Sequence, residues 1–165
     1  MKTVIRTLLL LALIVWLGAE IFFPVVAKTT FTQLAPDRHI AGQIAGSLLG
    51  ILHGMGLVCG LVLMALFALA SAWGIFKPRV ALASLGLVLV MVALTAYSQY
   101  AIIPAMERDR VAAGGVIDAV AKDNPARMHF DKLHNRSVNV EGAISVLGLV
   151  VVVLVASADT AGRRA

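Results

Sequence analysis

The chain has 165 residues, of which 60% are hydrophobic and 14% are charged, and its mean hydropathy is +0.92. A water-soluble chain of this length could not bury so much apolar surface, so the composition predicts an integral membrane protein surrounded by a lipid bilayer. The net charge of +5 is spread over short segments and forms no basic patch, so we expect no nucleic-acid partner. No dinucleotide-binding, P-loop or zinc-finger spacing occurs, and we expect no enzymatic activity.

Four apolar stretches are long enough to cross a membrane, since a hydrocarbon core about 30 Å thick needs roughly 20 residues of helix. They cover residues 4–27, 40–76, 80–103 and 138–158. The charged turn Lys77–Arg79 must lie in water, so the second and third stretches are antiparallel neighbours. We predict a single all-α domain over residues 1–165, an integral membrane antiparallel four-helix bundle.

The first stretch begins after Lys2 and Arg6 and could be mistaken for a secretory signal. Its apolar run continues through Phe22 and Phe23, and residue Leu17 does not fit a cleavage site at Ala19, so we expect it to remain as a span. Basic residues in the short segments favour both termini in the cytoplasm. We expect the protein in the cytoplasmic (inner) membrane of a bacterium.

The second stretch carries a strip of glycines at every fourth position, Gly42, Gly46, Gly50 and Gly54. Glycine is unfavourable in a soluble helix by roughly 1 kcal/mol relative to alanine, and in lipid the compensating advantage is close approach of helix backbones. The strip therefore predicts a helix-packing face, with a partner helix of this bundle, of a second copy or of another protein. Cys59 on the same stretch has no partner for an internal disulfide.

The connection over residues 104–137 is predicted to be aqueous. Pro104 ends or kinks the third span, and Asp123–Pro125 is a turn signal. Residues Met106–Lys122 have helix-forming composition, which predicts a short amphipathic helix over the mouth of the bundle. The alternative is that this segment extends the third span into water.

Polar residues gather in the outer half of all four spans, whereas the inner halves are almost uninterrupted Leu, Val, Ala and Ile. A buried carboxylate costs some 2–3 kcal/mol at membrane depth unless it is paired or protonated. A divalent metal ion, a proton or a histidinium would each compensate, since imidazole and carboxylate suit such metals. The candidate ligands of this polar cup are Glu20, His53, His134 and Glu141.

Simpler interpretations of the neighbouring polar residues stay open. Tyr97, Tyr100 and Trp73 are typical of an interfacial aromatic belt, and Ser137 and Asn139 of a helix start. Bis-histidine haem needs two histidines at similar depth, and only His53 lies well inside, so we expect no haem.

Five short motifs stand out along the chain: Trp16–Gly18, Phe22–Pro24, Ala41–Gly42, Ala45–Gly46 and Phe130–Ser137. They resemble the transmembrane protein 205-like family, which is also described as domain of unknown function 4149. The resemblance covers nearly the whole chain and implies a four-span membrane protein. It associates the animal relative with resistance to a platinum drug, which implies metal or small-solute handling.

Two functional hypotheses follow. The first is an accessory or structural membrane protein that packs through the glycine strip, either with its own copy as a homo-oligomer or with another membrane protein, and needs no cofactor. The second is the handling of a metal ion, a proton or a small solute through the polar cup.

Overall fold

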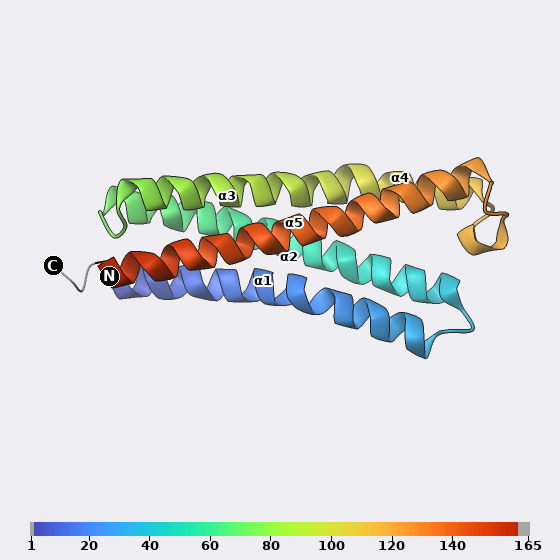
Figure 1. Cartoon of the computed structure of the whole chain (residues 1–165), viewed down its shortest axis with the longest axis horizontal. Helices are drawn as coiled ribbons and strands as arrows, with labels where there is room; N and C mark the ends of the chain where they lie inside the picture. The colour runs from blue at the N-terminus through green and yellow to red at the C-terminus, as the bar shows by residue number, and fades with distance from the viewer. Residues whose placement is uncertain (1, 162–165) are drawn as a thin grey trace.

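A computed structural model describes residues 2–161, with side chains as far as Ala158. Four long helical rods lie side by side and antiparallel, and α1 begins at the end of the molecule where α5 ends (Figure 1). We call this the terminal end and the opposite one the distal end. In chain order the elements are α1 (Lys2–Gln33), α2 (Arg38–Ala72), α3 (Pro78–Tyr97), the π-helix η1 (Ser98–Ile102), α4 (Ile103–Ala112), the 3₁₀ turn η2 (Ile117–Ala119) and α5 (Pro125–Ala161).

Each rod is long and apolar enough to cross a membrane. In the most apolar 18-residue stretch of each rod, only 28–33% of the residues are buried within the chain. Most of the apolar side chains therefore face outward, as the exposed Leu82, Ile14 and Val153 illustrate. Outward-facing apolar side chains on helices of this length are stable only in lipid. The predictions of an integral membrane protein and of a four-helix bundle are confirmed.

The second helix ends at Ala72, four residues before the predicted end of its span. Gly74 adopts a left-handed conformation with φ of 59°, which reverses the chain and lets the amide of Ile75 bond to the carbonyl of Ala70 at 2.9 Å. Ile75 and Phe76 then turn back and are buried against the bundle. The apolar character of these two residues reflects packing in a turn and not continuation of the helix.

The third rod continues through η1 and α4 as far as Ala112, so residues 106–112 extend the third span. This is the alternative that the sequence left open, and the separate amphipathic helix is reduced to the single turn η2. Pro104 is accommodated within the continuous rod because it directly follows the wide turn of η1. The rod breaks only at Gly114 and Gly115, whose φ values are 80° and 93°.

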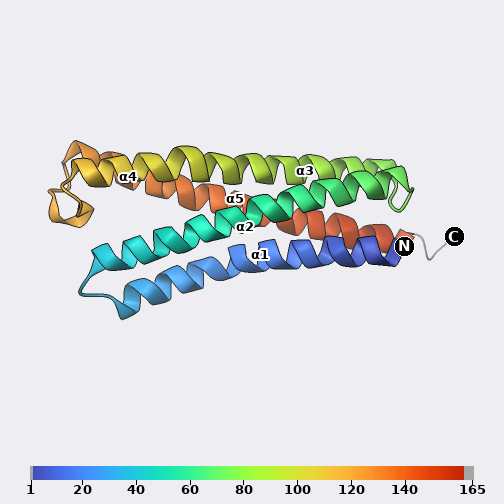
Figure 2. The ribbon, with the colours of Figure 1, turned by 180° about the vertical axis from the view of Figure 1, so that it is seen from behind.

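The tightly packed core lies in the terminal half of the bundle. Trp16, Phe67 and Met91 are among its largest buried side chains. Toward the distal end, α1 has no buried residue after Glu20, and α2 has none between Ala41 and Leu52. The distal parts of α1 and α2 accordingly lie away from α4 and α5 in both views (Figures 1 and 2).

The glycine strip does not pack inside this bundle. A Cβ atom at Gly46, Gly50 or Gly54 would meet nothing within 4 Å, and at Gly42 it would only touch the tip of the Phe31 ring at 4.0 Å. The expectation that the strip packs against another helix of the same chain is therefore wrong at Gly46, Gly50 and Gly54. A contact with a second copy or another protein stays a prediction.

The glycines of α2 at which a Cβ atom would clash with another helix are Gly56 and Gly60, both nearer the terminal end than the strip. A Cβ atom at Gly56 would lie 2.6 Å from Nε1 of Trp16, and one at Gly60 would lie 2.3 Å from Cγ2 of Val92. On α5, a Cβ atom at Gly148 would lie 2.9 Å from Cδ1 of Leu17. The missing side chains at Gly56 and Gly60 let α2 approach α1 and α3 closely, and the one at Gly148 does the same for α5.

Candidate functional site

A cluster of polar side chains lies near the middle of the bundle, at the distal limit of the core. Each rod contributes to it: Glu20 from α1, His53 from α2, Ser98 and Gln99 from η1, and Glu141 from α5. We call these five residues the polar cluster. Three of the four predicted ligands, Glu20, His53 and Glu141, are therefore brought together.

His53 is at the centre of the cluster and is fully buried. Its Nδ1 atom lies 2.9 Å from Oε1 of Gln99, and its Nε2 atom lies 2.9 Å from Oε1 of Glu141. Both ring nitrogens are thus engaged, which fixes the orientation of the imidazole. The Gln99 amide can accept from Nδ1–H or, after rotation, donate to Nδ1, so it accommodates the neutral and the protonated ring.

Glu141 connects the imidazole to the third rod. Its Oε1 atom also accepts a hydrogen bond from Oγ of Ser98 at 2.9 Å. Its second oxygen, Oε2, is buried and has no hydrogen-bond partner. A buried carboxylate oxygen without a donor is costly, because nothing replaces the water that it loses.

Glu20 also has one buried carboxyl oxygen without a hydrogen-bond donor. Its Oε1 atom accepts a hydrogen bond from Nε1 of Trp16 at 3.1 Å, and its Oε2 atom is buried without a partner. The carboxyl group of Glu20 interacts electrostatically with both Glu141 and His53. Two incompletely satisfied carboxyl groups therefore share one buried site with an imidazole.

The π-helix explains how two consecutive residues reach this site. The amide of Ile103 bonds to the carbonyl of Ser98, five residues back, which widens the turn. Pro104 follows directly and cannot donate a backbone hydrogen bond, and in a regular α-helix its ring would clash with the carbonyl of Tyr100. The wide turn avoids that clash, and Ser98 bonds Glu141 while Gln99 bonds His53. π-Bulges of this kind occur frequently at functional sites.

Sequence reasoning missed Trp16 as a member of the site, and it placed Ser98 and Gln99 among the polar residues of the cup without assigning them a contact. Trp16 precedes Glu20 by four residues, a spacing that places both side chains on one face of a helix, so this contact was detectable. Ser98 and Gln99 gave a weaker signal: two polar residues in an apolar span shortly before a proline.

His134 is not part of the polar cluster. It is exposed on α5, seven residues before Glu141, which corresponds to about 10 Å along the helix axis. The structure therefore does not bring this predicted ligand together with the other three. In the described part of the chain, no group of three or more His, Cys, Asp and Glu side chains is arranged to hold a metal ion.

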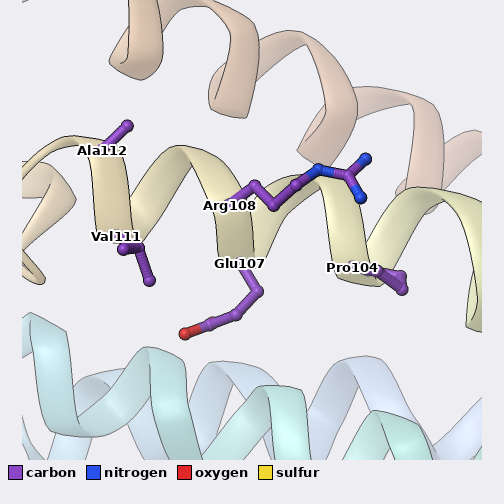
Figure 3. A pocket seen from close by; sticks show the side chains of 5 residues that line it. All are labelled: Pro104, Glu107, Arg108, Val111 and Ala112. Carbon is purple, nitrogen blue, oxygen red and sulfur yellow. The ribbon is translucent and has the colours of Figure 1, made fainter.

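A pocket of about 480 Å³ opens beside α4, farther toward the distal end. Its lining residues are Pro104, Glu107, Arg108, Val111 and Ala112, and Figure 3 shows Glu107 and Val111 pointing from α4 toward α1 and α2. Glu107 is paired with Arg110 on its own helix. No member of the polar cluster lines this pocket, so the two features are separate.

Four apolar helical rods that bury carboxyl and imidazole groups near mid-length define an integral membrane protein with an intramembrane polar site. The model of the family described as domain of unknown function, DUF4149, matches residues 11–114, more than half of the chain, and the protein belongs to this family. The match includes four members of the polar cluster and ends before Glu141. No curated protein and no solved structure matches the chain. The finer likeness to the transmembrane protein 205-like family stays a prediction.

Proposed function

We propose that this membrane protein binds and exchanges a proton at the polar cluster. The observation that carries the proposal is the pair of buried atoms Glu20 Oε2 and Glu141 Oε2, neither of which has a hydrogen-bond donor. A proton from hydronium that binds one carboxylate forms an O–H group and leaves water behind. That O–H group is the donor that the second carboxylate lacks.

The charge of the cluster supports the same conclusion. With both carboxyl groups ionised and His53 protonated, the site carries a net negative charge in a region of low dielectric constant. Such a charge is expensive unless it is neutralised. One further proton makes the cluster neutral, and the rotatable amide of Gln99 lets His53 take either protonation state.

A proton fits this site better than a divalent metal ion. Both ring nitrogens of His53 already face a protein partner at 2.9 Å, so neither presents a free lone pair to a metal. Only the two carboxyl groups would remain as ligands, and each has only its Oε2 atom to offer, because the Oε1 atoms already accept hydrogen bonds from Trp16 and Ser98. Metal or small-solute handling therefore requires the cluster to rearrange.

The fluorescence of Trp16 reports on the protonation of Glu20, because the indole N–H donates a hydrogen bond to that carboxyl group. In a Trp73→Phe background Trp16 is the only tryptophan, and its indole N–H bonds to Glu20. We expect its fluorescence in detergent to change reversibly with pH between about 5 and 8, the range in which a histidine-linked site titrates. Glu20→Gln should abolish this change, because glutamine imitates the protonated acid and cannot titrate.

The control is Glu107→Gln, which removes an exposed carboxyl group on α4 and should leave the titration intact. Infrared difference spectra should show a carbonyl band of a protonated carboxyl group that Glu20→Gln removes. The proposal is refuted if the fluorescence titration persists in Glu20→Gln, or if neither measurement responds to pH in the parent protein.

An accessory role through the glycine strip is the second proposal. It is favoured by one observation, namely that Gly46 and Gly54 have nothing within 4 Å of the position that a Cβ atom would take. Small residues on an outward helix face allow close approach of a second helix. A second copy of this chain is the partner that we propose, and cross-linking of a variant with a bulky residue in the strip tests it.

We also propose that the terminal end faces the cytoplasm of a bacterial cell. Lys2 and the turn residues Lys77 and Arg79 are basic and exposed at that end, and positive charges favour the cytoplasmic side. In a Cys59→Ala background, a cysteine at exposed Asp123 should react with an impermeant thiol reagent added to intact cells, and a cysteine at Lys77 should not. The opposite labelling pattern would reverse the orientation.

A further inference from the structure

We infer that the polar cluster exchanges its proton with the distal aqueous face alone, and that Glu141 is the group through which the proton enters and leaves. The inference rests on the proposed function and assigns to that site a direction of access. It makes the cluster a detector of the pH on one side of the membrane and not a path across it.

Exposure singles out Glu141 among the titratable members. Its side chain is 15% exposed, whereas Glu20 is 3% exposed and His53 is fully buried. On α5, the residues before Glu141 include exposed polar side chains, such as Arg136 and Asn139, whereas those after it face an apolar core that begins with Ile144. Glu141 therefore stands at the boundary between polar and apolar surroundings.

The polar groups nearest to Glu141 are the other members of the cluster. The titratable groups that face it are Glu20 from α1 and His53 from α2, and η1 contributes Ser98 and Gln99. Farther out, Arg136 bonds the hydroxyl group of Tyr97, and ion pairs join Glu107 to Arg110 and Asp109 to His129.

The terminal side of the cluster is closed by apolar side chains. Each of these side chains is at most 1% exposed: Leu13, Leu63, Phe67, Met91 and Val151. A proton relay needs successive donors and acceptors within about 3 Å of each other. These side chains offer none.

Two hydroxyl groups lie on the core face of α3, and neither completes a relay. Thr95 donates its hydroxyl to the carbonyl of Met91 within its own helix. Ser84 is buried, but it stands 14 residues before Ser98, about 21 Å along the axis. Within residues 2–158, the buried polar side chains therefore form no continuous chain from the cluster to the terminal end.

The distal side, in contrast, is loosely packed. The distal parts of α1 and α2 bury almost no residues, and Figure 2 shows them lying away from α4. The partly exposed carboxyl group of Glu141 therefore borders the end of the bundle where α1 and α2 bury few residues. The closed packing on the terminal side and the loose packing on the distal side both favour proton exchange with the distal face.

The experiment places the protein with Trp73→Phe, Cys59→Ala and Asp123→Cys in lipid vesicles. Labelling of the cysteine introduced at position 123 with an impermeant thiol reagent gives the fraction of molecules whose distal end faces outward. We expect rapid acidification of the solution at the distal face to change the fluorescence of Trp16. Acidification at the terminal face should have no effect until a proton ionophore is added.

The role of Glu141 is tested by the rate of this change. Glu141→Gln should slow the response at least about tenfold, because the carboxylate that relays the proton is lost. The two rates are compared at the pH midpoint that each protein shows in its own equilibrium titration, because the substitution also removes one charge from the cluster. Glu141→Asp keeps a carboxylate and should respond faster than Glu141→Gln. If Glu141→Gln does not fold, the rate of Glu141→Asp is compared with that of the parent protein instead. Glu107→Gln is the matched control and should keep the parent rate.

Two outcomes would overturn the inference: an equal response to acidification at either face, or a response in Glu141→Gln as fast as in the parent. Neither outcome affects the proposed function, which is tested separately by the equilibrium titration of Trp16 in detergent. A site that titrates in detergent but responds from both faces would remain a proton site with access from both sides.

Discussion

Replacing Gly60 by alanine is expected to destabilise the bundle by roughly 1–3 kcal/mol, the range for overpacking a filled core. The added Cβ atom would lie 2.3 Å from Cγ2 of Val92 and 3.1 Å from Cζ3 of Trp16. Trp16 is fully buried and cannot move without displacing its neighbours. Thermal unfolding in detergent, followed by circular dichroism, measures the effect as a lower Tm.

The matched control is Gly50→Ala on the same helix, where the new Cβ atom meets nothing within 4 Å. We expect its stability to stay within about 0.5 kcal/mol of the parent, as for substitutions without new contacts. Equal losses for both variants would contradict the packing described above. Gly50→Leu adds the test of self-association: a loss of dimer in cross-linking, with the Tm of the monomer unchanged, would support the accessory role.

The two glycine patterns show what sequence reasoning could and could not decide. Gly46 and Gly50 are four residues apart, and so are Gly56 and Gly60, yet only the second pair contacts helices of this chain. The spacing predicts a close-packing face but not its partner. Lipid tails are as apolar as leucine, so hydropathy does not distinguish the face toward protein from the face toward lipid.

For the polar cluster, too, the sequence predicted some of the members but not their contacts. Glu20, His53 and Glu141 stand out because charged groups within apolar spans are costly, and distance along each helix placed them at similar depth. Depth does not give the direction of a side chain around the helix. That direction decides that Gln99 binds His53, whereas His134 is kept from the cluster by about 10 Å along α5.

Trp16 joins the packing of the bundle to the polar cluster. Its ring fills the space left by Gly56 and Gly60, and its indole N–H binds Glu20. A Cβ atom at Gly56 would lie 2.6 Å from that same nitrogen. A substitution at this glycine therefore displaces the donor of Glu20, so the close contact between α1 and α2 is a condition for the geometry of the site.

Replacing His53 by leucine is expected to cost about 3–5 kcal/mol, because removal of one partner leaves the other buried and uncompensated. Glu141 would lose its bond to Nε2, and Gln99 would lose its partner at Nδ1. Glu141→Leu alone should also be destabilising, since it removes the acceptor of His53 and Ser98. Unfolding of the detergent-solubilised protein in a denaturing detergent gives the free energies.

The double variant decides whether these residues act as one site. If they do, His53→Leu combined with Glu141→Leu should cost less than the sum of the single changes, by roughly 0.5–3 kcal/mol, because neither partner then remains buried alone. His53→Leu combined with Glu107→Leu is the control, since Glu107 contacts Arg110 and not the cluster, and should be additive. Additivity in both pairs would mean that the imidazole and the carboxylate are independently tolerated polar groups. A coupling confined to the first pair is what a shared proton requires, because the charge of each group is then set by the other.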